Sequence, residues 1–433
     1  MRAVSRIADA FINKDAKEAE GVHSPPLRWV WRFYAWRLTH AGRWLVWPTV
    51  GFLAYTSASL NYQAFVPLSY VLALWLVALA VAALIRPRAS ITVRHADRLS
   101  AGQTLPVELD VEALTWGGDL YVLPHRLPGA VEAVPPDGVP VPPAAPGQKA
   151  RVRLGLHCPR RGVYGLRGYR VESDFPFGIV RSYRAFERAT PLVVYPQYAP
   201  LSRLEIPTGR RYQPGGVALA SDLGDSVEFI GSREFREGDN VRDIDWRATG
   251  RLLKPIVREY RQEYFLRVAV VLDTHVPPPS FGRRSQARRD KRRQSFEHAV
   301  SLTAAIGEHL ARKEYIVDIF AAGPNLYHLT AGRSLAYLEQ ILDILACVDE
   351  NPREPFDVIE PELMYDLSRI STVVCVFLDW TETRRAFVRN LKAEGVGLKT
   401  IVVSDTPCTL DPREDFEVRV VSHADFAQGI EEL

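Results

Sequence analysis

The longest apolar run of the chain, from Trp44 to Ile85, contains no Asp, Glu, Lys, Arg or His. As a single α-helix it would be about 63 Å long, twice the roughly 30 Å thickness of a bilayer's hydrocarbon core. The polar residues Asn61 to Gln63 divide the run into Trp44–Leu60 and Val66–Ile85, each near the spanning length. The pattern therefore predicts a transmembrane helical hairpin over residues 43–86.

Arginines flank this hairpin on both sides, and the turn inside it is uncharged. They are Arg28, Arg32, Arg37 and Arg43 before it, and Arg86, Arg88 and Arg94 after it. By the positive-inside rule, a cytoplasmic N-terminal segment (residues 1–42) and everything after the hairpin stay in the cytoplasm. We expect a multi-pass protein of the cell's inner (cytoplasmic) membrane, in contact with lipid. A buried helical hairpin inside a soluble protein is the alternative.

Residues 87–200 alternate apolar and polar positions, as in Leu105 to Val111 and Val152 to Leu156. Period two, interrupted by Gly and Pro, is typical of short antiparallel strands. We expect a β-rich, sandwich-like domain. In the stretch from Arg160 to Tyr183 we expect a hairpin that bends at Gly165 or Gly168.

Residues 266–433 alternate continuous apolar strands with helical spacing. The expected strands are Val268–Leu272, Tyr315–Phe320, Thr372–Leu378 and Leu398–Val403, with an edge strand around Phe416 to Val420. Strands that alternate with helices predict an α/β domain with a doubly wound parallel sheet. Together with the hairpin and the β-rich domain, this gives a multi-domain protein.

Three of the expected strands lead into an aspartate: Asp273, Asp379 and Asp405. Ligands of such sheets bind at the carboxyl ends of the strands, and two carboxylates there could hold Mg²⁺. The alternative is that these aspartates cap the helices that follow. No GxGxxG, GxxxxGK[ST] or GxSxG motif occurs, so no nucleotide loop or serine nucleophile is indicated.

Residues 201–265 form a linker that carries a dense charged motif, "REGDNVRDIDW" (Arg236–Trp246). We expect a turn and a short helix, capped by Asn240 and with Asp243 at its third position. Such carboxylates can act as acids and bases, but the interleaved arginines favour an ion-pair cluster packed around Trp246. Its expected role is to lock the linker against the α/β domain or to dock a partner. The candidate residues are Arg236, Gly238, Asp239, Arg242, Asp245, Trp246 and Arg251.

Composition narrows the function further. The chain has 433 residues and a net charge of only +3, which argues against nucleic acid as a partner. Its four cysteines are far apart, which indicates neither a disulfide framework nor a zinc site and suits a reducing compartment. The segment Arg283–Gln294 carries seven basic residues and one acid. We expect it to be flexible and solvated, or to touch anionic lipid headgroups.

The segment "REGDNVRDIDWRATGRLLKPIVREYRQE", followed by a strand that ends in aspartate, resembles the domain-of-unknown-function 58 (DUF58) family. An upstream element, "RRGVYGLRGYRVESDFPFGI", resembles the same family, and the resemblance spans roughly residues 40–405. It implies a membrane-anchored protein with a von Willebrand factor A-like C-terminal domain. It also implies MoxR-type AAA+ ATPases and transglutaminase-like membrane proteins as companions.

The chain departs from the metal-binding motif that this resemblance implies, Asp-x-Ser-x-Ser. Here the run is Asp273-Thr274-His275-Val276-Pro277, so two hydroxyl ligands are missing. With Asp379 as the later aspartate, too few oxygens remain for tight Mg²⁺ binding, and we expect no cofactor. We therefore expect a non-enzymatic, membrane-tethered scaffold or assembly factor whose α/β domain docks a protein partner. The alternative is a metal-dependent hydrolase that uses Asp273 and Asp379, or Asp243 and Asp245.

Overall fold

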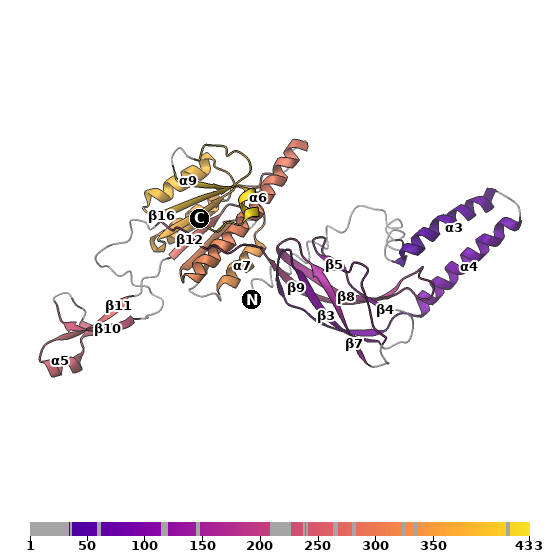
Figure 1. The fold of residues 1–433 in the computed structure, drawn as a ribbon, viewed down its shortest axis with the longest axis horizontal. Coiled ribbons are helices and arrows are strands. Elements are labelled where there is room, and N and C mark those ends of the chain that lie inside the picture. Colours follow the sequence, from indigo (N-terminus) through magenta and orange to yellow (C-terminus); the bar gives the residue numbers. More distant parts are fainter. Residues whose placement is uncertain are drawn as a thin grey trace. The chain divides into compact units, whose positions relative to one another are not determined.

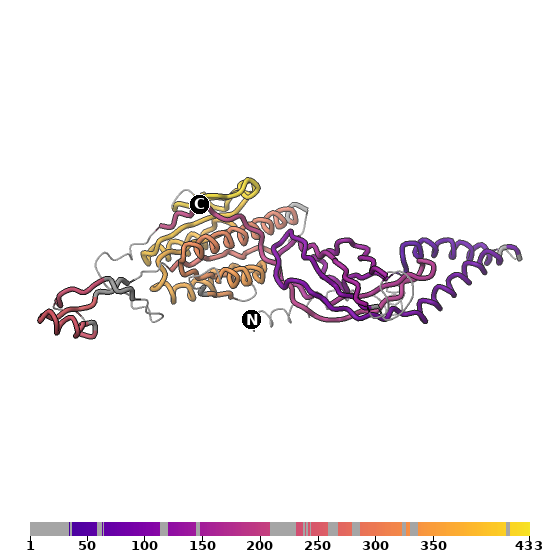
Figure 2. Tube along the Cα trace, turned by 60° about the horizontal axis from the view of Figure 1, so that its bottom comes forward, coloured from indigo at the N-terminus to yellow at the C-terminus, as the bar shows by residue number. Residues whose placement is uncertain are grey.

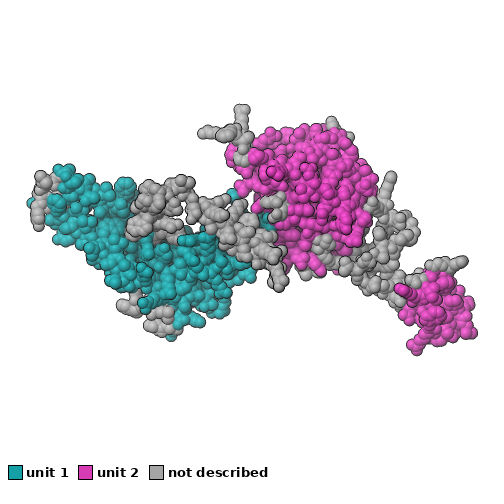
Figure 3. All heavy atoms as spheres, turned by 180° about the vertical axis from the view of Figure 1, so that it is seen from behind, with its two compact units in different colours: residues 1–197, 345–347 teal, residues 198–344, 348–433 magenta. Residues whose placement is uncertain are grey.

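The structure is a computed structural model, with its elements drawn in Figure 1 and its chain trace in Figure 2. It describes residues 34, 37–58, 62–113, 120–143, 148–207, 227–236, 239, 241–262, 267–278, 283–322, 326–331, 337–412 and 416–433. Contacts divide the chain into two compact units, which are coloured separately in Figure 3. The first contains residues 1–197 and 345–347, and the second contains residues 198–344 and 348–433.

Two helices, α3 (His40–Ala58) and α4 (Tyr62–Leu84), open the described part of the first unit. They lie side by side in Figures 1 and 2, and the Trp75 indole N–H donates to Thr49 Oγ1 at 3.1 Å. Within the described residues, one stretch is long and apolar enough to cross a bilayer: Phe65–Leu84, with a mean hydropathy of 2.3. This confirms an apolar helix here. The expected turn falls partly on residues 59–61, which lie outside the described residues.

Both helices expose large apolar side chains. On α3 these include Trp44 and Trp47, and on α4 they include Tyr70 and Leu76, which is 68% exposed. Soluble proteins rarely leave a contiguous apolar surface of this kind in water. The described part of the chain does not cover it.

The rest of the first unit is built from two antiparallel-rich sheets. The first has the order β1-β3-β7-β5: Ala89–Arg94, Thr104–Ala113, Lys149–His157 and Glu132–Val134. The second has the order β2-β9-β8-β4-β6: Arg98–Ser100, Ser182–Tyr195, Gly162–Ser173, Leu120–Pro124 and Val139–Pro140. Inward-facing side chains of both sheets, such as Val107 and Val171, share one core. The strand-rich prediction is confirmed, because period-two alternation buries one face of each strand.

The expected bend at Gly165 or Gly168 is wrong. Strand β8 runs through both glycines and pairs with β9, so the bend lies between Ser173 and Ser182. Gly168 instead marks a β-bulge and has φ of +97°. A Cβ there would lie 2.1 Å from the carbonyl oxygen of Phe186, so this position needs glycine.

The segment predicted to be a linker contains a small hairpin module, defined here as residues 227–262. Strands β10 (Val227–Glu234) and β11 (Ile256–Gln262) pair antiparallel, and η1 (Val241–Asp243) and α5 (Trp246–Leu252) lie between them. The expected turn and short helix are present. The helix begins later than expected, because Asp245 is its N-cap; Asn240 lies outside the described residues.

A six-stranded sheet organises the C-terminal part of the chain. Its order is β14-β13-β12-β15-β16-β17: Leu326–Ala331, Ile316–Ala322, Arg267–Leu272, Thr372–Phe377, Gly397–Val403 and Val418–Val421. The helices are α6 (Arg283–Arg312), α7 (Leu338–Cys347), α8 (Phe356–Asp366), η3 (Leu367–Arg369), α9 (Glu382–Ala393) and α10 (His423–Gln428). The mixed α/β architecture is confirmed.

The sheet is parallel except for β14, which pairs antiparallel with β13 at one edge. Neither β14 nor α8 was expected from the sequence. Residues Val268 to Leu272 of β12 are all fully buried, so helices cover both faces of the sheet at its centre. Helices α8 and α9 share a core with one face, and α6 contacts β12, β13, β15 and β16.

The chain order reverses between β12 and β15. These strands are parallel neighbours, but β13 follows on one side and β16 on the other. A crevice opens outside the carboxyl ends of the strands at such a switch point. Asp273 and Asp379 lie at this edge of the sheet, directly after β12 and shortly after β15.

Candidate functional site

Asp273 follows β12 immediately and is completely buried. Its Oδ1 accepts the backbone N–H of His275 at 2.9 Å. Its Oδ2 accepts the backbone N–H of Leu378 at 3.1 Å and the Nε–H of Arg384 at 2.8 Å. Protein donors therefore engage both carboxylate oxygens.

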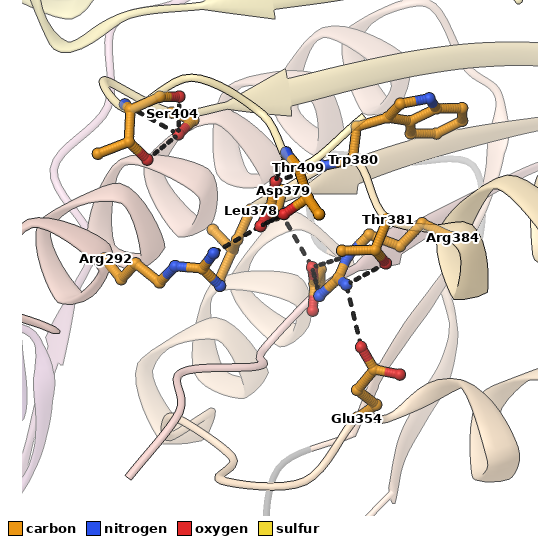
Figure 4. A network of polar contacts seen from close by, with 11 residues as sticks. Arg292, Glu354, Leu378, Asp379, Trp380, Thr381, Arg384, Ser404 and Thr409 are labelled. Atoms are coloured by element: carbon orange, nitrogen blue, oxygen red, sulfur yellow. Dashed lines mark hydrogen bonds and ion pairs between the residues drawn. The ribbon is translucent and has the colours of Figure 1, made fainter. Parts of the chain in front are cut away.

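Arg384 projects from the first turn of α9 and is only 1% exposed. One of its terminal nitrogens lies 2.7 Å from Asp273 Oδ2. The other donates to Thr381 Oγ1 at 2.9 Å and to Glu354 Oε1 at 3.2 Å, as Figure 4 shows. Burial alone would lower the pKa of Arg384, but the charge and hydrogen bonds of Asp273 raise it. The guanidinium is thus a fixed buried cation.

Asp379 forms a second, separate cluster beside the first. Its Oδ1 accepts the backbone N–H groups of Trp380 and Thr409 at 2.8 and 2.9 Å. Its Oδ2 accepts the Thr409 hydroxyl at 2.8 Å and a terminal N–H of Arg292 at 2.5 Å (Figure 4). Burial would raise the pKa of Asp379, but the hydrogen bonds from Thr409 and the charge of Arg292 lower it. This carboxylate is held ionised.

These contacts bear on both expectations for the two aspartates. The described residues contain no group of three or more His, Cys, Asp or Glu placed to hold a metal ion. The hydroxyl of Thr274, the residue that follows Asp273, is already engaged, because it donates to the backbone carbonyl of Ala322. Helix capping is not the role of Asp379 either, because the N-cap of α9 is Thr381. Each aspartate instead anchors an arginine.

A cleft of about 410 Å³ lies at this edge of the sheet. It is lined by His275, Pro277, Pro278, Arg288, Arg289, Arg292, Glu354, Asp379, Thr381, Arg384 and Thr409. Four of these residues are arginines, so the cleft favours negatively charged groups over cations.

Three of the cleft arginines come from the basic segment after Arg283, which was expected to be flexible and solvated. The segment is helical and forms the first turns of α6, and the side chains of Arg288 and Lys291 on it are exposed to solvent, as expected. Arg292 binds Asp379, and Arg289 lies 3.4 Å from Glu350. These ion pairs hold the basic turns against the α/β domain.

Sequence analysis missed Arg292, Arg384 and Thr409. A signal for Arg384 exists in helix α9, whose buried face is Arg384, Phe387, Val388 and Leu391. That spacing is the apolar stripe of an amphipathic helix, with an arginine in its first position. A cation on an apolar stripe needs a buried anion, which points to a strand-end aspartate.

In the hairpin module, Asp239 holds the turn after β10. It accepts two hydrogen bonds from the Arg233 guanidinium, both at 2.7 Å, and the backbone N–H of Arg236 at 2.7 Å. The hydrogen bonds from Arg233, and then from Arg236, lower the pKa of Asp239 to about 2. Its partner Arg233 was not among the expected residues, because a two-point contact across the turn has no local spacing rule.

Asp245 starts α5. Its Oδ1 accepts the backbone N–H groups of Arg247 and Ala248, both at 3.1 Å. Its Oδ2 lies 3.4 Å from Arg258 Nε on β11. The backbone hydrogen bond from Ala248 lowers the pKa of Asp245, and the charge of Arg258 lowers it further. A metal-dependent role for Asp245 would have to displace these contacts; the side chain of Asp243 lies outside the described residues.

The expected cluster packed around Trp246 is wrong. Trp246 is 69% exposed, and the apolar neighbours Val241, Leu252 and Leu253 are also exposed. The expected residues Arg236, Arg242 and Arg251 are exposed on the same module, and Gly238 lies outside the described residues. The carboxylates fix the local fold, and the apolar and cationic side chains face outward.

The third strand-end aspartate, Asp405, lies 2.8 Å from Nδ1 of His423, and Nε2 of that histidine is 3.0 Å from Ser295 Oγ. The order serine, histidine, aspartate is that of a hydrolytic triad. Ser295 is only 3% exposed, which leaves a substrate no approach to its hydroxyl. The three residues join α10 to α6.

Comparison with known proteins supports the resemblance found in the sequence. Residues 231–406 match the family described as "Protein of unknown function DUF58". This region includes most of the hairpin module, all three strand-end aspartates and every cleft residue except Thr409. No protein with a curated description matches the chain.

Solved structures give only weak similarity. One is the CARDB domain of a Pyrococcus furiosus protein in complex with di-metal ions, at 12% identity, 25% of this chain, 89% of that chain and a TM-score of 0.15. Another is a cohesin module from a Clostridium perfringens family 33 glycoside hydrolase, at 12% identity, 25% of this chain, 97% of that chain and a TM-score of 0.14.

Proposed function

We propose that this chain is a membrane-tethered, non-enzymatic scaffold that docks a protein partner through the DUF58-matching region. The observation that carries the proposal is the exposed apolar surface of the hairpin module. Trp246, Leu252 and Leu253 face solvent there, and Leu253 is 90% exposed. Tryptophan and arginine are the residues most enriched at the energetic centres of protein interfaces. The module combines both in a short segment.

Leu253 adds a second argument. It has φ of 55° and is the C-cap of α5, where glycine would be free of strain. A leucine gains nothing there from burial, because its side chain is in solvent. Strained backbone with an unburied apolar side chain is typical of binding sites, where the contact is made by another molecule.

The partner that we propose is a MoxR-type AAA+ ATPase, which the family resemblance implies, together with a transglutaminase-like membrane protein. The chain's sequence contains no nucleotide-binding loop. Such an ATPase would therefore supply the energy of ATP hydrolysis. Exposed arginines around Trp246, such as Arg247 and Arg251, favour an acidic rim on the partner's surface.

The tether that we propose is a pair of transmembrane helices, α3 and α4. The exposed apolar side chains of both helices and the hydropathy of Phe65–Leu84 support it. With arginines on both flanks, the two soluble parts would lie in the cytoplasm. The C-terminal sheet would belong to the von Willebrand factor A-like class, as the resemblance implies.

The arginine contacts of Asp273 and Asp379 support a scaffold over a metal-dependent hydrolase. A divalent cation at either carboxylate would have to displace a guanidinium, and would then face it as a like charge. We therefore propose that neither aspartate serves as a metal ligand, and that no cofactor is required.

The test is co-purification from detergent-solubilised bacterial membranes. The tagged full chain is expected to recover a MoxR-type ATPase, and the Trp246→Ala/Leu253→Ala variant is expected to lose it. Tyr365→Ala is the matched control, because Tyr365 is an exposed aromatic residue (84%) on α8. Equal recovery by all three chains would rule out the hairpin module as the docking surface.

A further inference from the structure

The arginine-lined cleft retains positive charge after its ion pairs are counted. Five guanidinium groups lie in or beside it: Arg288, Arg289, Arg292, Arg293 and Arg384. Four carboxylates pair with them: Asp273, Glu350, Glu354 and Asp379. One unit of positive charge is left over. Within the described residues, Arg288 is the member of this group that makes no ion pair or hydrogen bond.

Two further polar atoms in the described cleft residues make neither a hydrogen bond nor an ion pair. Arg289 Nε and His275 Nδ1 are buried and make no hydrogen bond to any described residue. A buried N–H without an acceptor, here the Nε–H of Arg289, costs free energy, and an incoming anion would relieve it. The donor of Arg289 and the free charge of Arg288 come from adjacent residues of α6.

The dimensions fit a side chain better than a bare ion. A volume of about 410 Å³ lies within the range of pockets that bind small organic groups. Pro277 and Pro278 line the cleft on the side of the β12 loop and provide apolar surface next to the arginines. A site of this kind suits a carboxylate carried on a short aliphatic stem.

We infer that this cleft binds the carboxylate of an acidic side chain of a protein partner, with Arg288 and Arg289 as its direct contacts. One surplus positive charge matches a carboxylate, whereas a phosphate monoester carries about −1.5 to −2 at neutral pH. The inference rests on the proposed docking function, because it names the chemistry of one contact with the partner. No metal ion takes part in the contact.

The test uses the detergent-solubilised full chain and two short peptides, Ac-Gly-Glu-Gly-NH2 and Ac-Gly-Gln-Gly-NH2, observed by saturation-transfer NMR. The glutamate peptide is expected to bind and the glutamine peptide is not. Arg288→Gln is expected to weaken binding about tenfold, the usual effect of losing a charged hydrogen bond. Lys291→Gln is the matched control: it removes the same charge from an exposed position of α6 outside the cleft.

Three results would overturn the inference. Equal weakening by Arg288→Gln and Lys291→Gln would show unspecific attraction by the basic helix. Displacement of the peptide by inorganic phosphate at much lower concentration than by acetate would show that the cleft prefers a phosphate. Binding that appears only when Mg²⁺ is added would show a metal-bridged contact.

Co-purification with the Arg288→Gln chain separates this inference from the proposed function. If the wild-type chain recovers the ATPase and Arg288→Gln recovers it equally, docking stands and the role of the cleft fails. If the wild-type chain recovers no partner but still binds the glutamate peptide in an Arg288-dependent way, the cleft chemistry stands and the docking proposal fails.

Discussion

Arg384 donates its Nε–H to Oδ2 of Asp273 at 2.8 Å, and both side chains are sealed from solvent. The carboxylate follows β12 and the guanidinium comes from α9, which follows the neighbouring strand β15. The pair therefore joins the two strands at the point where the chain order of the sheet reverses. Positive charge that a metal ion could supply at such a site is supplied here by the protein itself.

Arg384→Met is expected to destabilise the α/β domain by about 3–5 kcal/mol, because it leaves the Asp273 carboxylate buried and unpaired. The loss of unfolding free energy would be measured by denaturant unfolding of the solubilised chain, with hydrogen exchange of β12 and β15 as the readout. Arg389→Met is the control on the same helix: its side chain is 57% exposed, and a loss below about 0.5 kcal/mol is expected. Arg384→Met/Asp273→Asn is expected to recover most of the loss. A double variant as unstable as the single one would contradict the ion-pair explanation.

Asp379 makes stability depend on pH in the acid range. Its pKa in the folded chain is lowered from the ordinary 3.8, so it stabilises the fold above that value. The stabilisation is lost as pH falls through the lower, folded-state pKa. Thermal unfolding midpoints, measured from neutral pH downward, should therefore drop more steeply for the wild type than for Asp379→Asn. Parallel curves for the two chains would be inconsistent with the Arg292 and Thr409 contacts.

Mg²⁺ is expected to leave the thermal unfolding midpoint of the full chain unchanged, because protein donors already engage both oxygens of Asp273 and of Asp379. Differential scanning fluorimetry with Mg²⁺ or Mn²⁺, against the same concentration of a monovalent salt, would test this. A stabilisation by the divalent ion that disappears in Asp273→Ala would instead favour the metal-dependent hydrolase.

Leu76→Arg is expected to impair membrane insertion. Leu76 lies near the middle of Phe65–Leu84 and is 68% exposed, and an arginine at the centre of a span costs about 2.5–3.5 kcal/mol on insertion scales. Alkaline extraction of membranes would show the variant in the soluble or aggregated fraction. Thr92→Arg, at an exposed position of β1, should remain in the membrane pellet. If the wild type and both variants are soluble without detergent, the tether proposal fails.

Asp245→Ala is expected to loosen α5, because two backbone N–H groups lose their acceptor. Hydrogen exchange of residues 246–252 should speed up several-fold. Asp245→Asn should show little change in exchange, since asparagine caps helices equally well. An equal effect of Ala and Asn would mean that the ion pair with Arg258, and not the cap, holds the helix.

Much of the fold could be predicted from local patterns. The alternation at Val152, Leu154 and Leu156 predicted a half-buried strand, and the run from Val268 to Leu272 predicted a strand buried on both faces. Such patterns reflect which side of an element meets the core, and the core is the dominant source of folding free energy. Strand β14 and helix α8 were missed. The first is an edge strand whose sequence, LYHLTA, is neither continuously apolar nor alternating along its whole length, and the second contains Pro361, a residue that usually signals a break.

The candidate site could be predicted only in part. Asp273 and Asp379 were expected to lie at one edge of the sheet, and they do, because parallel strands end on the same side. Their partners are far away along the chain: Arg384 is 111 residues from Asp273, and Arg292 is 87 residues from Asp379. No spacing rule connects such residues. The prediction that Trp246 is packed was wrong for a related reason: local sequence does not determine whether an apolar side chain is buried in a core.

By itself the sequence determined where the apolar elements lie, since helix and strand periodicities follow from backbone geometry and can be recognised within a few residues. It also determined that Asp273 and Asp379 would lie at the same edge of the sheet. Only the tertiary structure decided what faces each carboxylate. Burying an ionised Asp demands a nearby donor or cation, and that demand can be met by any element that the fold brings close. Here α9 and α6 meet it with arginines.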